Sequence, residues 1–194
     1  MILLLDVMDT LVYDPFRTEA PAFFGISFEE VLALKDPHTW VRFETGEYDE
    51  RTFAELYFRD RRPVDVVGFK AALSSGYRLL AGIEDLLSEL VAAGVTLHAL
   101  SNYSPWYQLI EDRLHLSRFV PWTFVSCKTG VRKPDPEAYL GPARALGVSP
   151  GECLFVDDRP GNCAAAEAVG MPAHTFKDAQ TLRQDLLARG LLAT

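Results

Sequence analysis

The stretch ILLLDVMDT, residues 2–10, decides the fold of this chain. Four apolar residues, Ile2 to Leu5, run directly into the carboxylate Asp6, and a second carboxylate, Asp9, follows three positions later. A short, continuous apolar run is typical of a strand that is buried on both faces, as in a parallel sheet. An acid at the end of such a strand lies at the sheet edge where ligands bind. The stretch therefore predicts a parallel sheet with Asp6 at its functional edge.

Four further apolar runs resemble the first one, since they are short, bounded by Gly or Pro, and separated by helical patterns. Strands that alternate with helices predict an α/β fold, in which helices cover both faces of a parallel sheet. The predicted strands cover 95–100, 123–126, 153–156 and, more weakly, 173–176. The helices predicted around them cover 83–91, 136–146, 162–169 and 179–189.

The segment 14–77 differs from the rest of the chain. It contains no convincing strand, and it holds 12 of the 22 aromatic residues. Its pattern predicts short helices, one of them starting at Ser27 with Glu30 as a capping box. The others are expected around 39–43, 49–58 and 64–73. We interpret the segment as a helical insertion between the first strand and the helix that leads to the second.

Composition limits the class of partner. The 194 residues carry a formal net charge of -8, which argues against non-specific binding to nucleic acid or to anionic membranes. Three cysteines, Cys127, Cys153 and Cys163, have no spacing typical of a disulfide framework or zinc site. No apolar stretch approaches the roughly 20 residues of a membrane span. We expect a soluble cytoplasmic protein that acts on a small phosphorylated molecule. The sequence does not indicate whether the protein is a monomer or an oligomer.

Side chains suited to chemistry follow the ends of the predicted strands. Ligands of an open parallel sheet bind outside the carboxyl ends of its strands. We therefore expect three carboxylates, a hydroxyl and an ammonium to converge there. They come from Asp6 after the first strand, Ser101 and Asn102 after the second, Lys133 on the loop after the third, and Asp157 and Asp158 after the fourth.

This set of residues predicts phosphoryl transfer. Neighbouring carboxylates repel one another and raise each other's pKa unless a cation compensates them. Mg²⁺ prefers hard oxygen ligands, and Asp6, Asp157 and Asp158 would supply them. An oxygen of Asp6 that is left free can attack phosphorus as a covalent nucleophile. Ser101 and Lys133 would then hold the phosphoryl oxygens.

Each of these residues also has an ordinary structural interpretation when it is taken alone. A strand-end acid such as Asp6 is commonly solvated, and a pair such as Asp157-Asp158 can cap the following helix. A Ser-Asn pair is typical of a turn, and a lysine in a proline-rich loop is typical of a surface. Their joint occurrence after successive strands is what favours one site.

The same residues resemble the four motifs of the haloacid dehalogenase-like (HAD) hydrolase superfamily, in the family's order. The motifs are Asp6 to Leu11, Ser101-Asn102, Lys133 within Lys-Pro-Asp-Pro, and Asp157 to Asn162. The resemblance covers essentially the whole chain. It implies a Rossmann-like core at 1–13 and 78–194 and a type 1 helical cap at 14–77. It also implies a phosphatase with an aspartyl-phosphate intermediate and a Mg²⁺ ion held by Asp6, the carbonyl of Met8, Asp157 and Asp158.

Several longer strings resemble the plant plastid flavin mononucleotide (FMN) hydrolase branch of this superfamily. They are LLDVMDT at 4–10, DPF at 14–16, PAFFG at 21–25, SGY at 75–77, and Asn102-Tyr103 with Trp106-Tyr107. This resemblance implies hydrolysis of FMN to riboflavin and phosphate, and another small phosphometabolite stays open as the substrate. The plastid proteins carry a leader that we do not find here, so a plastid location is expected only for a trimmed chain.

The chain departs from the family's pattern next to the nucleophile. Most phosphatases of the superfamily have an Asp two positions after it, which protonates the leaving alcohol. Met8 stands there and cannot exchange protons, while Asp9 lies one position later. We hypothesise that Asp9, or a water that it orders, supplies the proton. An equally weighted interpretation is that Asp9 only caps the turn before Thr10.

Residues near the predicted edge are candidates for contact with the substrate. Asn102, Tyr103 and Trp106 follow the second strand, and Phe16 and Arg17 lie where the chain enters the insertion. Aromatic residues of the insertion could stack on a flat ring or form its own small core.

Two alternative functions remain open at the level of sequence. The first is a metabolite-binding protein that keeps the fold without turnover, which the missing acid at Met8 favours. The second is a 2-haloacid dehalogenase, because a halide leaves without a proton. The acidic pair Asp157-Asp158 argues against this second alternative, since dehalogenases of the superfamily lack it.

Overall fold

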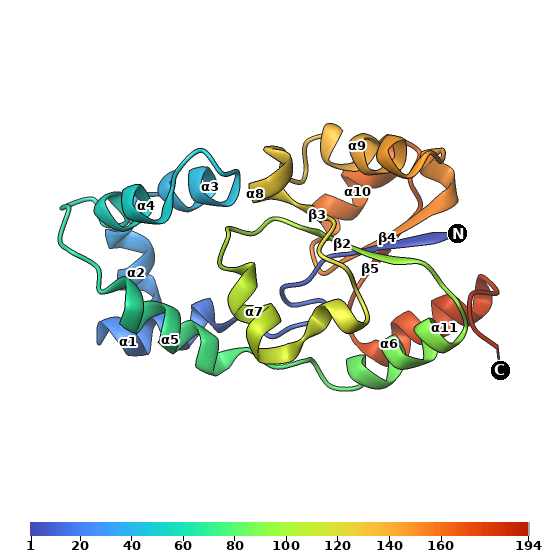
Figure 1. Cartoon of the computed structure of the whole chain (residues 1–194), viewed down its shortest axis with the longest axis horizontal. Coiled ribbons are helices and arrows are strands. Elements are labelled where there is room, and N and C mark those ends of the chain that lie inside the picture. The colour runs from blue at the N-terminus through green and yellow to red at the C-terminus, as the bar shows by residue number, and fades with distance from the viewer. Residues whose placement is uncertain (194) are drawn as a thin grey trace.

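The computed structural model describes residues 1–193 and shows an α/β fold (Figure 1). Over these residues, five parallel strands form one sheet in the order β3-β2-β1-β4-β5. Every predicted strand is present, with bounds that differ by at most two residues. The strands are β1 (Ile2–Leu5), β2 (Leu97–Ser101), β3 (Phe124–Val125), β4 (Cys153–Asp157) and β5 (Ala173–Thr175).

The strand register brings the acids of the sequence motifs to one edge. β1 is the central strand, and Leu5 pairs with Val156 of β4 and with Ala99 of β2. The backbone N–H of Asp6 donates to the carbonyl of Val156 at 2.8 Å. Because the register continues by one residue, Asp6 and Asp157 lie side by side where their strands end.

Alternation along β1 divides the apolar core between the two faces of the sheet. Leu3 and Leu5 belong to a cluster on one face, and Leu4 belongs to a cluster on the other. Helices α6 (Ile83–Ala92), α7 (Tyr107–Leu114) and α11 (Ala179–Ala188) contribute to the first cluster. Helices α9 (Glu137–Leu146) and α10 (Pro160–Ala168) contribute to the second and lie across the sheet from α6 and α11 in Figure 1. The sheet is therefore covered on both faces, as the strand pattern predicts.

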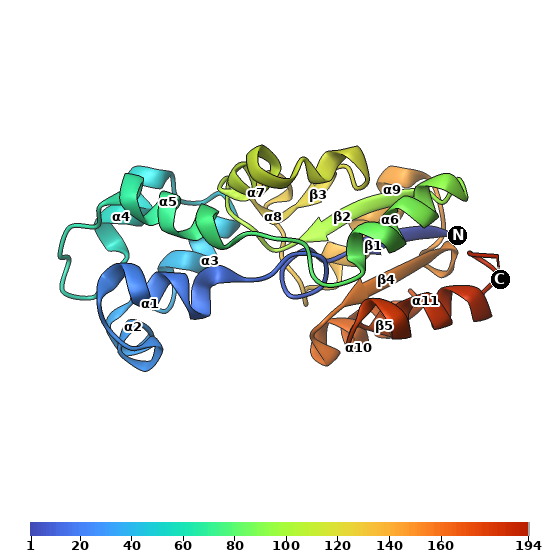
Figure 2. The ribbon, with the colours of Figure 1, turned by 90° about the horizontal axis from the view of Figure 1, so that it is seen from below.

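The segment 14–77 is helical and lies at one end of the molecule (Figures 1 and 2). The predicted capping box is present, since Ser27 and Glu30 exchange their side-chain and backbone hydrogen bonds. The helices are α1 (Glu19–Phe24), α2 (Phe28–Leu34), α3 (Thr39–Glu44), α4 (Glu50–Leu56) and α5 (Val66–Gly76), preceded by the 3₁₀ turn η1 (Pro15–Arg17). We refer to this segment as the cap. Its treatment as a separate domain stays a prediction.

Two short helices of the segment were not predicted, and their sequences explain why. Both η1 and α1 contain a proline, Pro15 and Pro21, which usually marks the end of a helix. Each proline lies in the first turn, where the helix has no N–H partner to lose. The core also contains α7 and the short helix α8 (Ser126–Thr129), for which no individual prediction was made.

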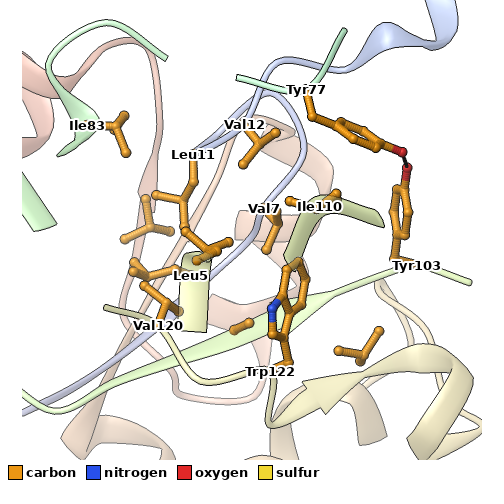
Figure 3. Close-up of a cluster of buried hydrophobic side chains, with 14 of the residues drawn as sticks. Leu5, Val7, Leu11, Val12, Tyr77, Ile83, Tyr103, Ile110, Val120 and Trp122 are labelled. Atoms are coloured by element: carbon orange, nitrogen blue, oxygen red, sulfur yellow. Dashed lines mark hydrogen bonds between the residues drawn. The ribbon is translucent and has the colours of Figure 1, made fainter. Parts of the chain in front are cut away.

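The cap and the core share a buried interface. In Figure 3, Tyr77 at the end of the cap and Tyr103 after β2 point toward one another beside the apolar cluster around Val7 and Ile110. Their hydroxyl oxygens lie 2.6 Å apart, and both residues are buried. On the other side, α3 approaches α8, and the hydroxyl of Ser126 donates to the carbonyl of Glu44. The cap is thus held against the core on two sides.

No helix within residues 1–193 combines the length and the apolar character that crossing a bilayer demands.

Candidate active site

Lys133 lies at the centre of the charged groups at the sheet edge. Its Nζ lies 2.8 Å from Oδ1 of Asp6 and 2.7 Å from Oδ2 of Asp157, and it donates to the carbonyl of Leu100 at 2.8 Å. The side chains of Lys133 and Asp157 are almost completely buried, and Asp6 is 8% exposed. A buried ammonium is tolerated only where acceptors surround it. The three contacts therefore fix the ammonium between the two acids.

The carboxylate of Asp157 is also held by the start of α10. Its Oδ1 accepts the backbone N–H of Arg159 at 2.8 Å. The side-chain amide of Asn162 donates to both of its oxygens, at 3.1 and 3.0 Å. A carboxylate that accepts this many hydrogen bonds keeps one orientation. Asp157 therefore fixes the position of Lys133 from inside the protein and does not line the cavity.

Asp158 completes a group of three acids. One ligand atom from each of Asp6, Asp157 and Asp158 lies within 4.8 Å of the other two. The backbone N–H of Asp158 donates to Oγ1 of Thr10 at 3.1 Å, which ties the turn after β1 to the turn after β4. This contact sets the position of Asp158 relative to Asp6.

The electrostatics of the three acids leave an excess of negative charge. Burial raises the pKa of Asp6 to about 6, although Lys133 lowers it, and the neighbouring Asp157 raises it further. Burial also raises the pKa of Asp158, and Asp157 adds to the effect. One ammonium does not compensate three carboxylates. Hard oxygen donors with uncompensated charge fit Mg²⁺, so the residues present are suited to the predicted ion.

The turn after β1 brings Asp9 to the same cavity. Asp9 has a φ of 55°, in the left-handed region that Asp tolerates better than most residues. Its N–H donates to the carbonyl of Val12 at 2.8 Å, and its Oδ1 accepts the N–H of Asp14 at 3.3 Å. Its Oδ2 lies 3.9 Å from the guanidinium of Arg17. Asp9 thus lines the cavity and also contacts Asp14 and Arg17, where the chain enters the cap.

The two polar residues at the end of β2 have different surroundings. Asn102 exchanges two hydrogen bonds of 2.8 Å with the backbone of Lys133, so both atoms of its amide position that residue. Ser101 is buried, and its Oγ has no hydrogen-bond partner within residues 1–193. It borders a smaller cavity of about 240 Å³ and not the main one. The roles expected for these two residues stay predictions.

A cavity of about 280 Å³ lies between the acids and the cap. Most of the site residues predicted from the sequence line it, and the helical cap forms its opposite wall. The predicted residues that line it are Asp6, Met8, Asp9, Phe16, Arg17, Asn102, Tyr103, Lys133 and Asp158.

Trp106 does not reach this cavity. It is 2% exposed, and its ring packs edge-on against Phe43, Phe53 and Phe69 of the cap. Its Nε1 donates to Glu50 at 2.6 Å. Trp106 therefore joins the core to the cap, and the expected contact with a substrate is not supported by its position.

Four other lining residues were not among the sites predicted from the sequence. Glu44 is 3% exposed and pairs with Nε of Arg132 at 2.6 Å. Lys35 comes from the end of α2, and Arg159 lies at the start of α10. Arg132 and Arg159 are direct neighbours of motif residues, a cue that could have found them. No local pattern distinguishes the cap residues Lys35 and Glu44 from surface charges.

Comparisons with known proteins identify the family. The model of the haloacid dehalogenase-like hydrolases matches residues 16–170. The chain is 46% identical over 190 residues to flavin mononucleotide hydrolase 1 of the Arabidopsis thaliana chloroplast, covering 98% of this chain and 78% of the relative. It is 29% identical to hexitol phosphatase A of Escherichia coli, over 75% of this chain and 66% of that protein. The chain belongs to the haloacid dehalogenase-like hydrolases, and within that family it is an enzyme of the phosphatase type.

Solved structures agree on the fold. A HAD family enzyme of Bacteroides thetaiotaomicron, solved with magnesium and inorganic phosphate, has a TM-score of 0.72 at 21% identity and covers 90% of this chain and 93% of its own. A HAD-like hydrolase of Porphyromonas gingivalis has a TM-score of 0.77 at 23% identity, with 96% and 98% covered. These similarities confirm the predicted α/β architecture with a helical cap.

Proposed function

We propose that this protein is a Mg²⁺-dependent phosphomonoester hydrolase that works through an aspartyl-phosphate on Asp6 and that its substrate is FMN. The observation that carries the proposal is the contact of Lys133 with Asp6 and Asp157 beside Asp158, with Asp6, Lys133 and Asp158 lining the cavity. This arrangement supplies a nucleophile, a fixed positive charge and oxygen ligands at one point, and phosphoryl transfer needs little more.

In the first half-reaction, a carboxylate oxygen of Asp6 attacks phosphorus, and the bond between phosphorus and the ester oxygen breaks. The leaving alcohol takes up a proton. In the second half-reaction, water attacks the phosphorus of the aspartyl-phosphate, which releases inorganic phosphate and restores Asp6. Lys133 stays beside the phosphoryl group, where its ammonium stabilises the negative charge that spreads over the oxygens.

The expected metal ligands are Asp6, the carbonyl of Met8, Asp157 and Asp158. When bound, Mg²⁺ would neutralise charge on the phosphoryl oxygens and lower the repulsion between the acids. Asp157 is already oriented by Asn162 and by the N–H of Arg159. Such supporting contacts to a ligand strengthen metal binding.

Asp9 is the proposed source of the proton for the leaving alcohol. Its carboxylate lines the cavity with Asp6, while Met8 has no proton to give. The contact with the N–H of Asp14 holds one oxygen of Asp9. The other oxygen lies 3.9 Å from the guanidinium of Arg17, which is too long for a direct hydrogen bond and leaves that oxygen free to face the cavity.

The choice of FMN is supported by the relative and by the cap. The relative that is 46% identical over nearly the whole chain is named a flavin mononucleotide hydrolase. The wall opposite the acids includes the rings of Phe16, Phe28 and Trp40, which suit a flat ring system. The acidic group argues against dehalogenation, because a reaction without phosphate has no need of a cation.

Phosphate release from FMN and from p-nitrophenyl phosphate, each with Mg²⁺ and with a chelator, tests the proposal. We expect release from FMN that requires both Mg²⁺ and Asp6, so that Asp6→Asn is inactive. A panel of sugar phosphates and nucleotides identifies the substrate if p-nitrophenyl phosphate alone is hydrolysed. Tight binding of FMN without release of phosphate would instead indicate a binding protein, the alternative that Met8 favours.

A further inference from the structure

Lys35 presents an unpaired positive charge to the cap side of the cavity. It lies directly after α2, lines the cavity and is partly buried. Within residues 1–193 its Nζ makes no hydrogen bond and no ion pair, and it lies over the face of Phe16, 4.9 Å from the ring centroid. Burial lowers the pKa of the ammonium, and Glu44 offsets this only in part. Because this ammonium donates to no protein acceptor, its hydrogen bonds are free for a ligand, and partial burial makes such a bond stronger than one in open water.

The surroundings of Lys35 are aromatic. The ring centroids of Phe16 and Trp40 lie 6.3 Å apart with an angle of 33° between the planes. Phe28 meets Phe16 edge-on at 6.0 Å. All three rings line the cavity. A flat ring seated against Phe16 and Trp40 would therefore have its edge within reach of Lys35.

The other cations that line the cavity are paired with acids or lie closer to the sheet edge. Lys133 is held by the acids at the sheet edge, and Arg132 is paired with Glu44. Arg159 directly follows Asp158 and caps the start of α10, beside the acids. Arg17 faces Asp9, and its side chain is 68% exposed. Within residues 1–193, Lys35 is thus a cavity-lining cation of the cap that makes no ion pair, and it belongs to the wall opposite the acids.

We propose that Lys35 determines specificity by donating a hydrogen bond to a carbonyl oxygen or ring nitrogen on the edge of a flat heteroaromatic ring that packs against Phe16 and Trp40. The inference rests on the proposed function and names the part of the substrate that the cap recognises. A phosphate ester whose ring has no acceptor gains nothing from Lys35. The residue therefore separates flavin-like substrates from simple aryl phosphates of the same charge.

Kinetics of Lys35→Met on two substrates test this inference. FMN has acceptors on its ring, and phenyl phosphate has a ring without any. We expect the KM for FMN to rise about tenfold at nearly unchanged kcat, because the lost contact is made equally before and during the reaction. For phenyl phosphate, kcat/KM should stay within about twofold. Binding of riboflavin, followed by quenching of its fluorescence, should weaken by the same factor as binding of FMN.

Lys70→Met is the matched control. Lys70 is also a partly buried lysine of the cap, but it pairs with Glu50 at 2.8 Å and does not line the cavity. Thermal unfolding of both variants shows whether the cap is intact. Equal losses on FMN and phenyl phosphate, or no loss on FMN, would overturn the role of Lys35 while the phosphatase assignment stands. A wild-type protein that hydrolyses phenyl phosphate but neither binds nor hydrolyses FMN overturns the flavin assignment itself, and this inference with it.

Discussion

The Nζ of Lys133 lies 2.8 Å from Oδ1 of Asp6, and both side chains are buried at the end of the central strand. The ammonium favours the ionised form of the acid, but it does not outweigh the loss of water, and the pKa of Asp6 stays raised at about 6. A nucleophile held in this way is costly to ionise without a further cation. The relationship predicts how stability, pH and metal binding are linked.

The first prediction concerns the metal-free protein. The folded pKa of Asp6, about 6, exceeds its ordinary value of 3.8, so the folded state binds the proton more tightly. Stability is therefore lost as the pH rises from about 4 through 6, by at most about 3 kcal/mol. Asp6→Asn removes this loss. We expect the variant to unfold at a higher temperature than the wild type at pH 7.5 in chelator, with a smaller difference at pH 5.

The control for this experiment is Asp112→Asn, which removes an exposed carboxylate of α7. It should leave the dependence of stability on pH unchanged. Addition of Mg²⁺ should stabilise the wild type and much less so Asp6→Asn, since ligand binding to the folded state raises its stability. A metal-free Asp6→Asn that is less stable than the wild type at pH 7.5 would contradict the expected cost of ionisation.

The second prediction concerns Asp158, whose N–H is held by Thr10 while its carboxylate lines the cavity. Asp158→Asn keeps the shape of the side chain and removes one negative charge from the metal ligands. We expect the Mg²⁺ concentration for half-maximal activity to rise about tenfold or more. Titration of activity with Mg²⁺ measures this directly. An unchanged midpoint, equal to that of Asp112→Asn, would remove Asp158 from the set of ligands.

The residues at the sheet edge could be predicted because short stretches of sequence, an apolar run and the residues directly after it, are sufficient to place them. Each strand is a short apolar run, and the register places whatever follows it at the same edge. Asp6, Asp157 and Lys133 therefore meet as expected, although they are distant in the sequence. For Asp6 and Asp157 the strand ends alone are enough, because parallel strands share one direction, whereas Lys133 lies on the loop after α8.

The cap side could not be predicted in the same way. Lys35 and Glu44 reach the cavity only because short helices fold back over the core, and charged residues on such helices are usually solvated. Trp106 is the opposite case, because it was expected at the cavity and does not line it. It follows β2 closely, but the aromatic rings of the cap draw it into the interface and away from the cavity. The packing of the cap on the core decides where these three side chains lie, and the periodicity of a short stretch of sequence does not predict that packing.

The third prediction addresses the missing acid. The alcohol released from FMN is a poor leaving group and needs a proton, whereas p-nitrophenolate leaves without one. If Asp9 supplies this proton, Asp9→Asn lowers kcat on FMN by about 10²-fold and changes kcat on p-nitrophenyl phosphate little. Asp6→Asn should abolish both activities. Full kcat on FMN for Asp9→Asn, with Asp6→Asn inactive, would leave Asp9 as a residue that only supports the turn.

The last prediction concerns the ion pair between Glu44 of the cap and Arg132 beside Lys133. Burial raises the pKa of Glu44, and Arg132 lowers it in part. Arg132→Met leaves a buried acid without its partner. We expect a loss of about 2 kcal/mol at pH 8, less than for a fully buried pair because 35% of the Arg132 side chain is exposed.

The sign of the pH effect follows from the raised pKa of Glu44. The acid is neutral and tolerated at low pH, so the deficit of Arg132→Met should shrink at pH 5 and grow as the pH rises. Adding Glu44→Gln removes the unpaired charge and should restore most of the loss, a result that urea unfolding of the four proteins measures. Losses that simply add in the double variant would mean that the two side chains stabilise the fold independently.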